Sequence, residues 1–419
     1  MKNTKLSMVL HYLWVCFHWT VFSVLTGIAC GCVGGAFCLF VQWSNELRRD
    51  HPNLLFILPL AGLLIVALYK MFGITEDKGT DLIFDSVRSK EEIPFQVIFV
   101  SFLSTIFTHL FGGSAGRVGV AMQMGGGISS VFAKRLGLSK KDKSLLVMCG
   151  MSGLISALFG APIMATFLSM EVVSLGVIYY AALLPCLITA LTSYFVTRLL
   201  GLAPMHYQLA LIPAVNAKSV TKVGVLALGC ALVSMLFCAF MVLWGRLMKK
   251  YIKNQYVRVA LGAGIIILLS LLVGNQSYNG SSASLLDAAL LYGQAHPWDF
   301  LLKILFTGIT LQSGYKGGAV FPALIIGATF GCAVGPLLGL PATFAAAVGM
   351  IAVFCGAVNC PIASICFSVE VFGAGGLILF ALAAAVSFVF SGYLTVFPGQ
   401  DFVYSKIRME YKHSDLREK

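Results

Sequence analysis

Two long stretches almost without charge limit what this chain can fold into. Between residues 144 and 197 the only charged side chain is Glu171, and between residues 317 and 400 the only one is Glu370. An α-helix needs about 20 apolar residues to cross the hydrocarbon core of a bilayer. Each stretch is therefore long enough for two or more crossings, and we predict an all-α polytopic membrane protein.

The overall composition agrees with this prediction. Only 11% of the 419 residues are charged and 58% are hydrophobic, whereas soluble domains average about 25% charged residues. A net charge of +12 in a soluble protein would suggest nucleic acid as a partner. Here the basic residues lie near the ends of apolar segments, as they do beside membrane helices. We therefore expect a multi-pass protein of the cell membrane, which contacts the lipid bilayer and no nucleic acid.

The sequence has no pattern that is typical of an enzyme. It contains no serine, histidine and aspartate spaced as a catalytic triad and no nucleotide-binding loop. The 12 cysteines are scattered through apolar segments without the paired spacing of a zinc site. We expect no catalytic activity, no cofactor and no metal ion.

An internal repeat divides the chain into two homologous halves. Residues 150–162 (GMSGLISALFGAP) align without gaps on residues 349–361 (GMIAVFCGAVNCP), at an offset of 199 residues. Each copy is followed nine residues later by a Glu-Val pair, which begins at Glu171 in one half and at Glu370 in the other. Repeated halves with helices broken by glycine and proline are typical of transporters, and the broken segments indicate the substrate site.

Glycine-rich basic turns precede both copies of this repeat. GRVG at residues 116–119 and KGGAVFP at residues 316–322 each lead into an apolar run. We therefore predict one transmembrane domain over residues 1–419, with repeat halves at about 20–200 and 222–410 and without a cytoplasmic regulatory domain.

These two turns predict a site for a small anion. Glycine lets backbone N–H groups approach a ligand closely, and a helix N-terminus carries unpaired N–H donors and about half a positive charge. Such a site attracts an anion without holding it as tightly as a fixed charge would, which suits conduction. Glycine-rich turns also serve simply to pack membrane helices, and this alternative stays open.

Several motifs, in the same order, resemble the CLC chloride channel and antiporter family. GRVG at 116–119 is similar to the family's GREGP, and KGGAVFP at 316–322 is similar to its second pore motif. FGAP at 159–162, followed by Glu171, resembles the next helix pair, and FVY at 402–404 resembles the last helix. The stretch LFTGITLQSGYKGG that precedes Ala319 is nearest to the fluoride-transporting branch of the family.

The resemblance implies an inverted repeat, a homodimer and one anion pathway in each subunit. It implies pathway walls at helix starts near Gly79–Thr80, Val118 and Val320–Phe321, with the hydroxyl of Tyr404 opposite. The residues assigned to the pathway on this basis are Gly79, Thr80, Gly116, Arg117, Val118, Gly119, Gly317, Gly318, Ala319, Val320, Phe321 and Tyr404.

The chain departs from the family pattern where protons are handled. Val118 stands where GREGP has its gating glutamate, and Ala319 stands where the fluoride branch has a second one. Val172 stands where chloride/proton antiporters have an internal glutamate. Residues 78–81 also lack both the GSGIP of chloride members and the methionine of the fluoride branch. Valine and alanine cannot bind a proton, so we predict a passive channel for chloride, fluoride or both.

Two alternatives to this function remain. One is a proton-coupled chloride or fluoride antiporter, with protons routed through Glu171. The other is a membrane scaffold that keeps the fold without transporting ions. Glu171 and Glu370 would otherwise be structural carboxylates that accept hydrogen bonds from a neighbouring helix end. Arg117 and Lys316 would either steer anions or pair with an acceptor group.

Overall fold

The computed structural model describes residues 2–74, 78–88, 91–408 and 410–411, and it confirms the helical fold class. The first half contains α1 (Lys2–Asp50), α2 (Leu58–Met71), α3 (Asp81–Val87), α4 (Gln96–Leu110), α5 (Val118–Arg135), α6 (Lys140–Phe159), α7 (Pro162–Glu171) and α8 (Leu183–Leu199). The second half contains α9 (Ala217–Tyr251), α10 (Gln255–Val273), α11 (Ala283–Leu291), α12 (Asp299–Ser313), α13 (Val320–Val334), α14 (Ala342–Val358), α15 (Pro361–Phe372) and α16 (Leu377–Phe390). Short 3-10 turns lie at Pro52–Ile57, Tyr180–Ala182, Gly335–Leu338 and Ala374–Gly376.

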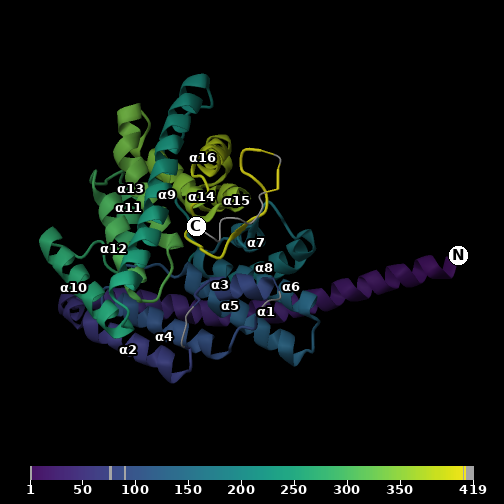
Figure 1. Cartoon of the computed structure of the whole chain (residues 1–419). Coiled ribbons are helices and arrows are strands. Elements are labelled where there is room, and N and C mark those ends of the chain that lie inside the picture. Colours follow the sequence, from purple (N-terminus) through teal and green to yellow (C-terminus); the bar gives the residue numbers. More distant parts are fainter. Residues whose placement is uncertain (1, 75–77, 89–90, 409, 412–419) are drawn as a thin grey trace.

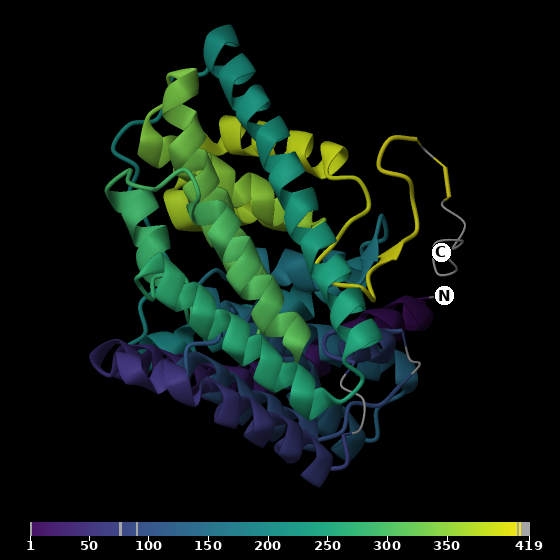
Figure 2. The same ribbon diagram turned by 60° about the vertical axis from the view of Figure 1, so that its left-hand side comes forward.

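The two halves use the same packing scheme. α1 packs against α4, α6 and α8, and its counterpart α9 packs against α12, α14 and α16. α5 packs against α6 as α13 packs against α14, and the halves meet where α7 contacts α15 and α2 contacts α10. The purple and blue helices of the first half lie beneath the green and yellow helices of the second half in both views (Figures 1 and 2). The repeat in the sequence is thus a repeat in the structure.

Glycines of the repeated motif allow the closest of these helix pairs to form. A Cβ atom added at Gly125 of α5 would lie 2.1 Å from the carbonyl oxygen of Gly150 in α6. In the other half, a Cβ at Gly327 of α13 would lie 2.2 Å from the carbonyl oxygen of Gly349 in α14. Both distances are shorter than any real Cβ contact, so the backbones approach this closely only without side chains. Small residues play this part between membrane helices because lipid provides no hydrophobic force that drives helices together.

Seven helical segments of the described chain are long and apolar enough to cross a membrane. They are Leu13–Asp50, Pro52–Met71, Lys140–Phe159, Tyr180–Leu199, Ala217–Tyr251, Gln255–Val273 and Val320–Leu338. Other apolar helices, such as α4, α14 and α15, are shorter than a full span. The protein is therefore built from a mixture of full-length and partial membrane helices.

Three features of the local structure differ from what the sequence pattern alone indicates. The apolar run over residues 162–200 reads as one helical segment, but α7 ends at Glu171 and α8 begins only at Leu183. Strand β1 (Ser174–Leu175) separates them and pairs in parallel with β2 (Asp401–Phe402). The same pairing holds residues 402–404 in an extended segment, so these residues do not form the expected last helix. α11 is a further helix that the apolar pattern did not indicate.

Candidate functional site

The starts of α5 and α13 meet through their glycines. The N–H of Gly116 donates to the carbonyl oxygen of Gly318 at 2.7 Å, and the N–H of Gly318 donates to the carbonyl oxygen of Gly116 at 2.7 Å. Each helix begins two residues later, at Val118 and Val320, and neither helix has a side-chain hydrogen bond at its N-cap. The first-turn N–H groups of both helices lack an intrahelical partner, and the mutual glycine hydrogen bonds bring the two helix starts close together.

Gly119 lies where a third segment reaches this place. A Cβ atom added at Gly119 would lie 3.4 Å from Cγ2 of Thr80 and 3.5 Å from Cα of Gly318. Thr80 is the residue that precedes α3, and Gly79 before it has a φ of +56°, which favours glycine. The structure thus brings together the three helix starts that the resemblance assigned to the pathway.

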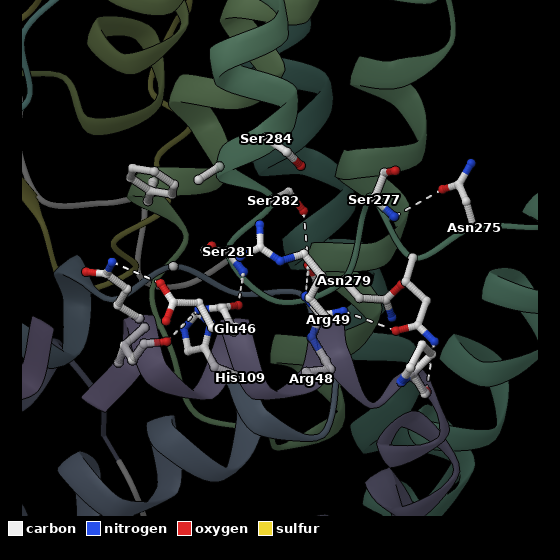
Figure 3. A pocket seen from close by; sticks show the side chains of 18 of the residues that line it. Glu46, Arg48, Arg49, His109, Asn275, Ser277, Asn279, Ser281, Ser282 and Ser284 are labelled. Carbon is white, nitrogen blue, oxygen red and sulfur yellow. Dashed lines mark hydrogen bonds between the residues drawn. The ribbon is translucent and has the colours of Figure 1, made fainter. Parts of the chain in front are cut away.

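A cavity lies on each side of this meeting point. The first cavity, of about 760 Å³, includes Gly116, Arg117 and Phe321 in its lining, and we call it the Arg48 vestibule (Figure 3). The second cavity, of about 830 Å³, is lined by Gly79, Thr80, Gly119, Gly317, Gly318 and Ala319, and we call it the Lys316 vestibule.

Two residues assigned to the pathway, Val118 and Val320, are packed in the core at the helix starts. The side chains of Val118 and Val320 are 0% exposed and line neither cavity. The first side chain of each helix is therefore apolar, and the polar groups where the two helix starts meet belong to the backbone.

Basic side chains outnumber acidic ones in both vestibules. The Arg48 vestibule is lined by Arg48, Arg49 and Arg117 and by one acidic residue, Glu46. The Lys316 vestibule is lined by Lys78, Lys249, Lys253, Arg258 and Lys316 and by the acidic residues Asp81 and Asp85. An excess of positive charge at both mouths raises the local concentration of anions and lowers that of cations.

The two intramembrane carboxylates cap helices of opposite halves. Glu171, at the end of α7, accepts hydrogen bonds from the N–H groups of Ile362 (3.3 Å) and Ala363 (2.9 Å) at the start of α15. Glu370, near the end of α15, accepts hydrogen bonds from the N–H groups of Ile163 and Met164, both at 2.8 Å, at the start of α7. These are the contacts that the structural interpretation of the two residues anticipates. The exchange is reciprocal, as a two-fold axis between the halves requires.

We expect Glu171→Ala to destabilise the protein by about 2 kcal/mol or more, because it removes the acceptor of two buried N–H donors and the charge that opposes the α15 dipole. Glu370→Ala removes the equivalent cap from α7. The loss would appear as a lower midpoint of thermal unfolding in detergent. Glu171→Gln is the matched control, since it keeps the shape and one acceptor oxygen and so loses less. A Glu171→Ala protein as stable as the wild type would contradict the capping role.

Tyr404 is not placed with the helix starts. It lines neither vestibule, and its ring packs on Gly176, whose added Cβ would lie 2.8 Å from the Tyr404 ring, and on Tyr411, with ring centroids 4.6 Å apart. The β1–β2 pairing holds this segment against the end of α7. The hydroxyl of Tyr404 as an anion ligand therefore stays a prediction from the resemblance.

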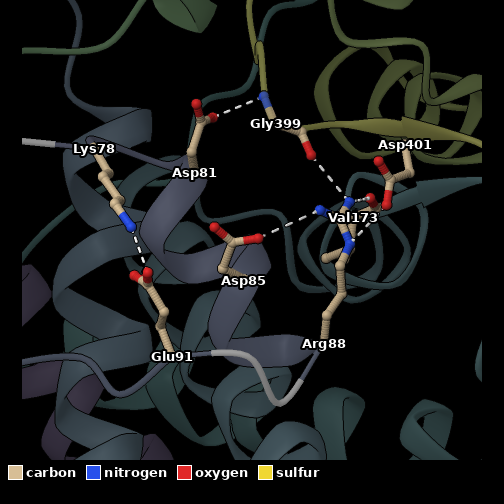
Figure 4. Close-up of polar contacts among 8 residues, drawn as sticks. All are labelled: Lys78, Asp81, Asp85, Arg88, Glu91, Val173, Gly399 and Asp401. Carbon is tan, nitrogen blue, oxygen red and sulfur yellow. Dashed lines mark hydrogen bonds and ion pairs between the residues drawn. The ribbon is translucent and has the colours of Figure 1, made fainter. Parts of the chain in front are cut away.

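Polar contacts that the sequence did not indicate fix α3 beside the pathway (Figure 4). Asp81, the first residue of α3, accepts a hydrogen bond from the N–H of Gly399 at 2.8 Å. Arg88, just after α3, donates to the carbonyl oxygens of Val173 (2.6 Å) and Gly399 (2.9 Å) and pairs with Asp401 at 3.0 Å. Thr80 is thus held in place through residues that are far apart in the sequence.

Comparisons with known proteins give one consistent result. The family model described as "Voltage gated chloride channel" matches residues 61–392. A relative named "Chloride/fluoride channel protein", from Pseudomonas syringae pv. tomato, is 30% identical over 411 residues, which cover 96% of this chain and 91% of the relative.

Two solved structures are also similar. A CLC-type fluoride/proton antiporter has a TM-score of 0.90 at 31% identity, and the match covers 92% of this chain and 98% of that one. A slow cyanobacterial Cl⁻/H⁺ antiporter has a TM-score of 0.75 at 20% identity, with 89% and 94% covered, and it supports the fold alone.

Proposed function

Because the chain belongs to the voltage gated chloride channel family, whose members transport anions across membranes, we propose that it is a passive channel for chloride, fluoride or both, without coupling to protons. The observation that carries this proposal is the meeting point of the two helix starts, which contributes lining residues to both vestibules. The backbones of two helix starts meet there, and the side chains that begin the two helices, Val118 and Val320, cannot be charged. An anion is stabilised there without any group that takes up or releases a proton.

The two other positions of the proton route support the same proposal. Ala319, which lines the Lys316 vestibule, and Val172, which is fully buried beside Glu171, have no titratable group. Glu171 itself holds the start of α15 with both of its carboxylate oxygens. A proton bound there would weaken the cap, so a proton route through Glu171 would work against the contacts that the residue makes.

The alternative is a proton-coupled antiporter, and a specific observation favours it. The similar structure at 31% identity is described as a fluoride/proton antiporter, and its fold agrees with this chain over nearly the full length. In that case Glu171 would carry the protons. It is the titratable residue directly before Val172, the position where chloride/proton antiporters have their internal glutamate.

Liposomes separate the two functions. Purified protein is reconstituted with internal chloride or fluoride, and anion efflux and external pH are recorded together. If the protein is a channel, anion efflux sets up a voltage across the membrane. Compensating protons then cross only when a proton ionophore is added, because the protein does not carry them. Efflux with protons moved in a fixed ratio to the anion, and loss of only the proton flux in Glu171→Gln, would instead establish the antiporter. If neither halide leaves the liposomes, the protein is a membrane scaffold that does not transport ions.

We also propose that the protein is a homodimer in the cell membrane, with one pathway in each subunit. This proposal is supported by the family resemblance, and the mass of the purified protein in detergent tests it. A monomer that conducts anions in liposomes would contradict it.

A further inference from the structure

Two basic side chains, one lining the Arg48 vestibule and one beside it, are buried without an acidic partner in the described chain. Arg48 lies near the end of α1 and is 8% exposed, and Lys303 of α12 is 0% exposed. Neither forms an ion pair with a carboxylate in the described part of the chain. A buried charge is costly unless a charge of opposite sign or several strong hydrogen bonds offset that cost.

The contacts that both cations make are with neutral acceptors. Arg48 donates from Nη1 to the side-chain oxygen of Gln276 at 3.1 Å and from Nη2 to the carbonyl oxygen of Asn279 at 3.4 Å, and its Nε has no partner. Lys303 donates to the hydroxyls of Ser114 (2.9 Å) and Ser282 (2.8 Å). Lys303 uses its N–H donors in these hydrogen bonds, whereas the Nε–H donor of Arg48 has no acceptor in the described chain. Neither residue is paired with a carboxylate there.

His109 adds an unused donor to the same vestibule. The residue lies on α4, is 0% exposed and lines the cavity beside Arg48 (Figure 3). Neither of its ring nitrogens has a hydrogen-bond partner of normal geometry in the described chain, although the backbone of Gly116 lies close to the ring. A neutral imidazole carries one N–H donor, and a buried donor without a partner costs about 1–3 kcal/mol.

Arg117 connects this cluster to the helix starts. It is half-buried, lines the vestibule and precedes Val118 directly, and no hydrogen bond or ion pair of its guanidinium joins it to the rest of the described chain. Arg48, His109 and Arg117 thus come from three different segments and line one cavity, and Lys303 donates to Ser282, which lines the same cavity.

We propose that the Arg48 vestibule holds a second anion-binding site, in which Arg48, Arg117 and His109 bind a small monovalent inorganic anion before it reaches the helix starts. The bound ion pairs with arginines that form no ion pair with a carboxylate of the described chain, Glu46 included, and it uses the donors that the chain leaves over. The identity of the ion as a small anion rests on the proposed function. The new element is a binding site in the vestibule, apart from the helix starts.

Bromide is the probe that tests this site, because its anomalous X-ray scattering shows where it binds. In crystals of the full chain grown in bromide, we expect a peak between Arg48 and Arg117. In titration calorimetry of the detergent-solubilised protein, Arg48→Gln is expected to weaken bromide binding about tenfold or more, the effect of losing one charge-assisted hydrogen bond.

Two substitutions of His109 test the site even if Arg48→Gln fails to fold. His109→Phe removes the ring donor and is expected to weaken binding severalfold, whereas His109→Gln keeps an N–H donor and is expected to bind nearly as the wild type does. Arg198→Gln is the charge-matched control, since Arg198 is exposed at the end of α8 and lines neither vestibule.

The outcomes distinguish this site from the proposed function. Anion flux through liposomes without a bromide peak at Arg48, or equal binding by His109→Phe and Arg198→Gln, would overturn the site and leave the channel. A bromide peak at Arg48 in a protein that passes no halide would support the second anion-binding site and would contradict the proposal that the protein is a channel.

Discussion

Substitution of Val118 by glutamate is expected to reduce anion flux through liposomes more than tenfold at pH 7.5. The side chain of Val118 is fully buried at the start of α5, next to the mutual hydrogen bonds of Gly116 and Gly318. A carboxylate there would occupy the N–H donors that an anion needs. As the pH falls the carboxyl becomes protonated and loses its charge, so flux is expected to rise again toward pH 4.5.

The matched control for this experiment is Val118→Gln, which has the size of glutamate and cannot ionise. Its flux is expected to be lowered by its bulk alone and to be the same at every pH. Flux should be measured as halide efflux over the pH range for both variants and the wild type. Equal pH profiles for the glutamate and glutamine variants would place Val118 outside the anion pathway.

The second large effect is expected from Gly318→Ala, which should abolish flux and destabilise the protein by about 1–3 kcal/mol. The added Cβ would lie 2.7 Å from the backbone nitrogen of Gly119 and 3.0 Å from that of Val118. Backbone atoms cannot move aside as the end of a side chain can. The two helix starts must therefore separate, and their mutual hydrogen bonds must lengthen.

Two further alanine substitutions make this experiment specific. At Gly224 of α9 an added Cβ meets nothing within 4 Å, so Gly224→Ala is expected to match the wild type in both flux and thermal unfolding. At Gly119 the nearest contacts are 3.4–3.8 Å, so Gly119→Ala is expected to fold normally and to lower flux, because its methyl group enters the space beside Thr80. A Gly318→Ala protein that conducts as well as Gly224→Ala would show that the close contact is not needed.

The repeat in the sequence predicted much of the architecture because equivalent residues perform equivalent tasks in the two halves. Gly150 and Gly349 are paired in the alignment, and each allows one close helix contact in the structure. Glu171 and Glu370 are paired in the same way, and each caps the helix of the other half. Motif order and the glycine turns were also enough to indicate the helix starts.

Contacts between residues far apart in the chain could not be predicted in this way. The break between α7 and α8 depends on the pairing of Ser174 with Asp401, more than 200 residues away, whereas the local sequence is apolar enough for a continuous helix. The same limit applies to the Arg48 vestibule. A lone arginine, histidine or lysine in an apolar helix has no pattern of its own, and Arg48, His109 and Lys303 become a group only when α1, α4 and α12 pack.

The exchanged caps of α7 and α15 limit how this protein can move. A rocking of one half against the other, as in a carrier that opens first to one side and then to the other, would pull both caps apart at once. Four hydrogen bonds to carboxylates would be lost, at a cost of about 6–12 kcal/mol in all. These contacts therefore hold α7 and α15 together, and a rearrangement that leaves them intact costs less free energy than a rocking of the halves.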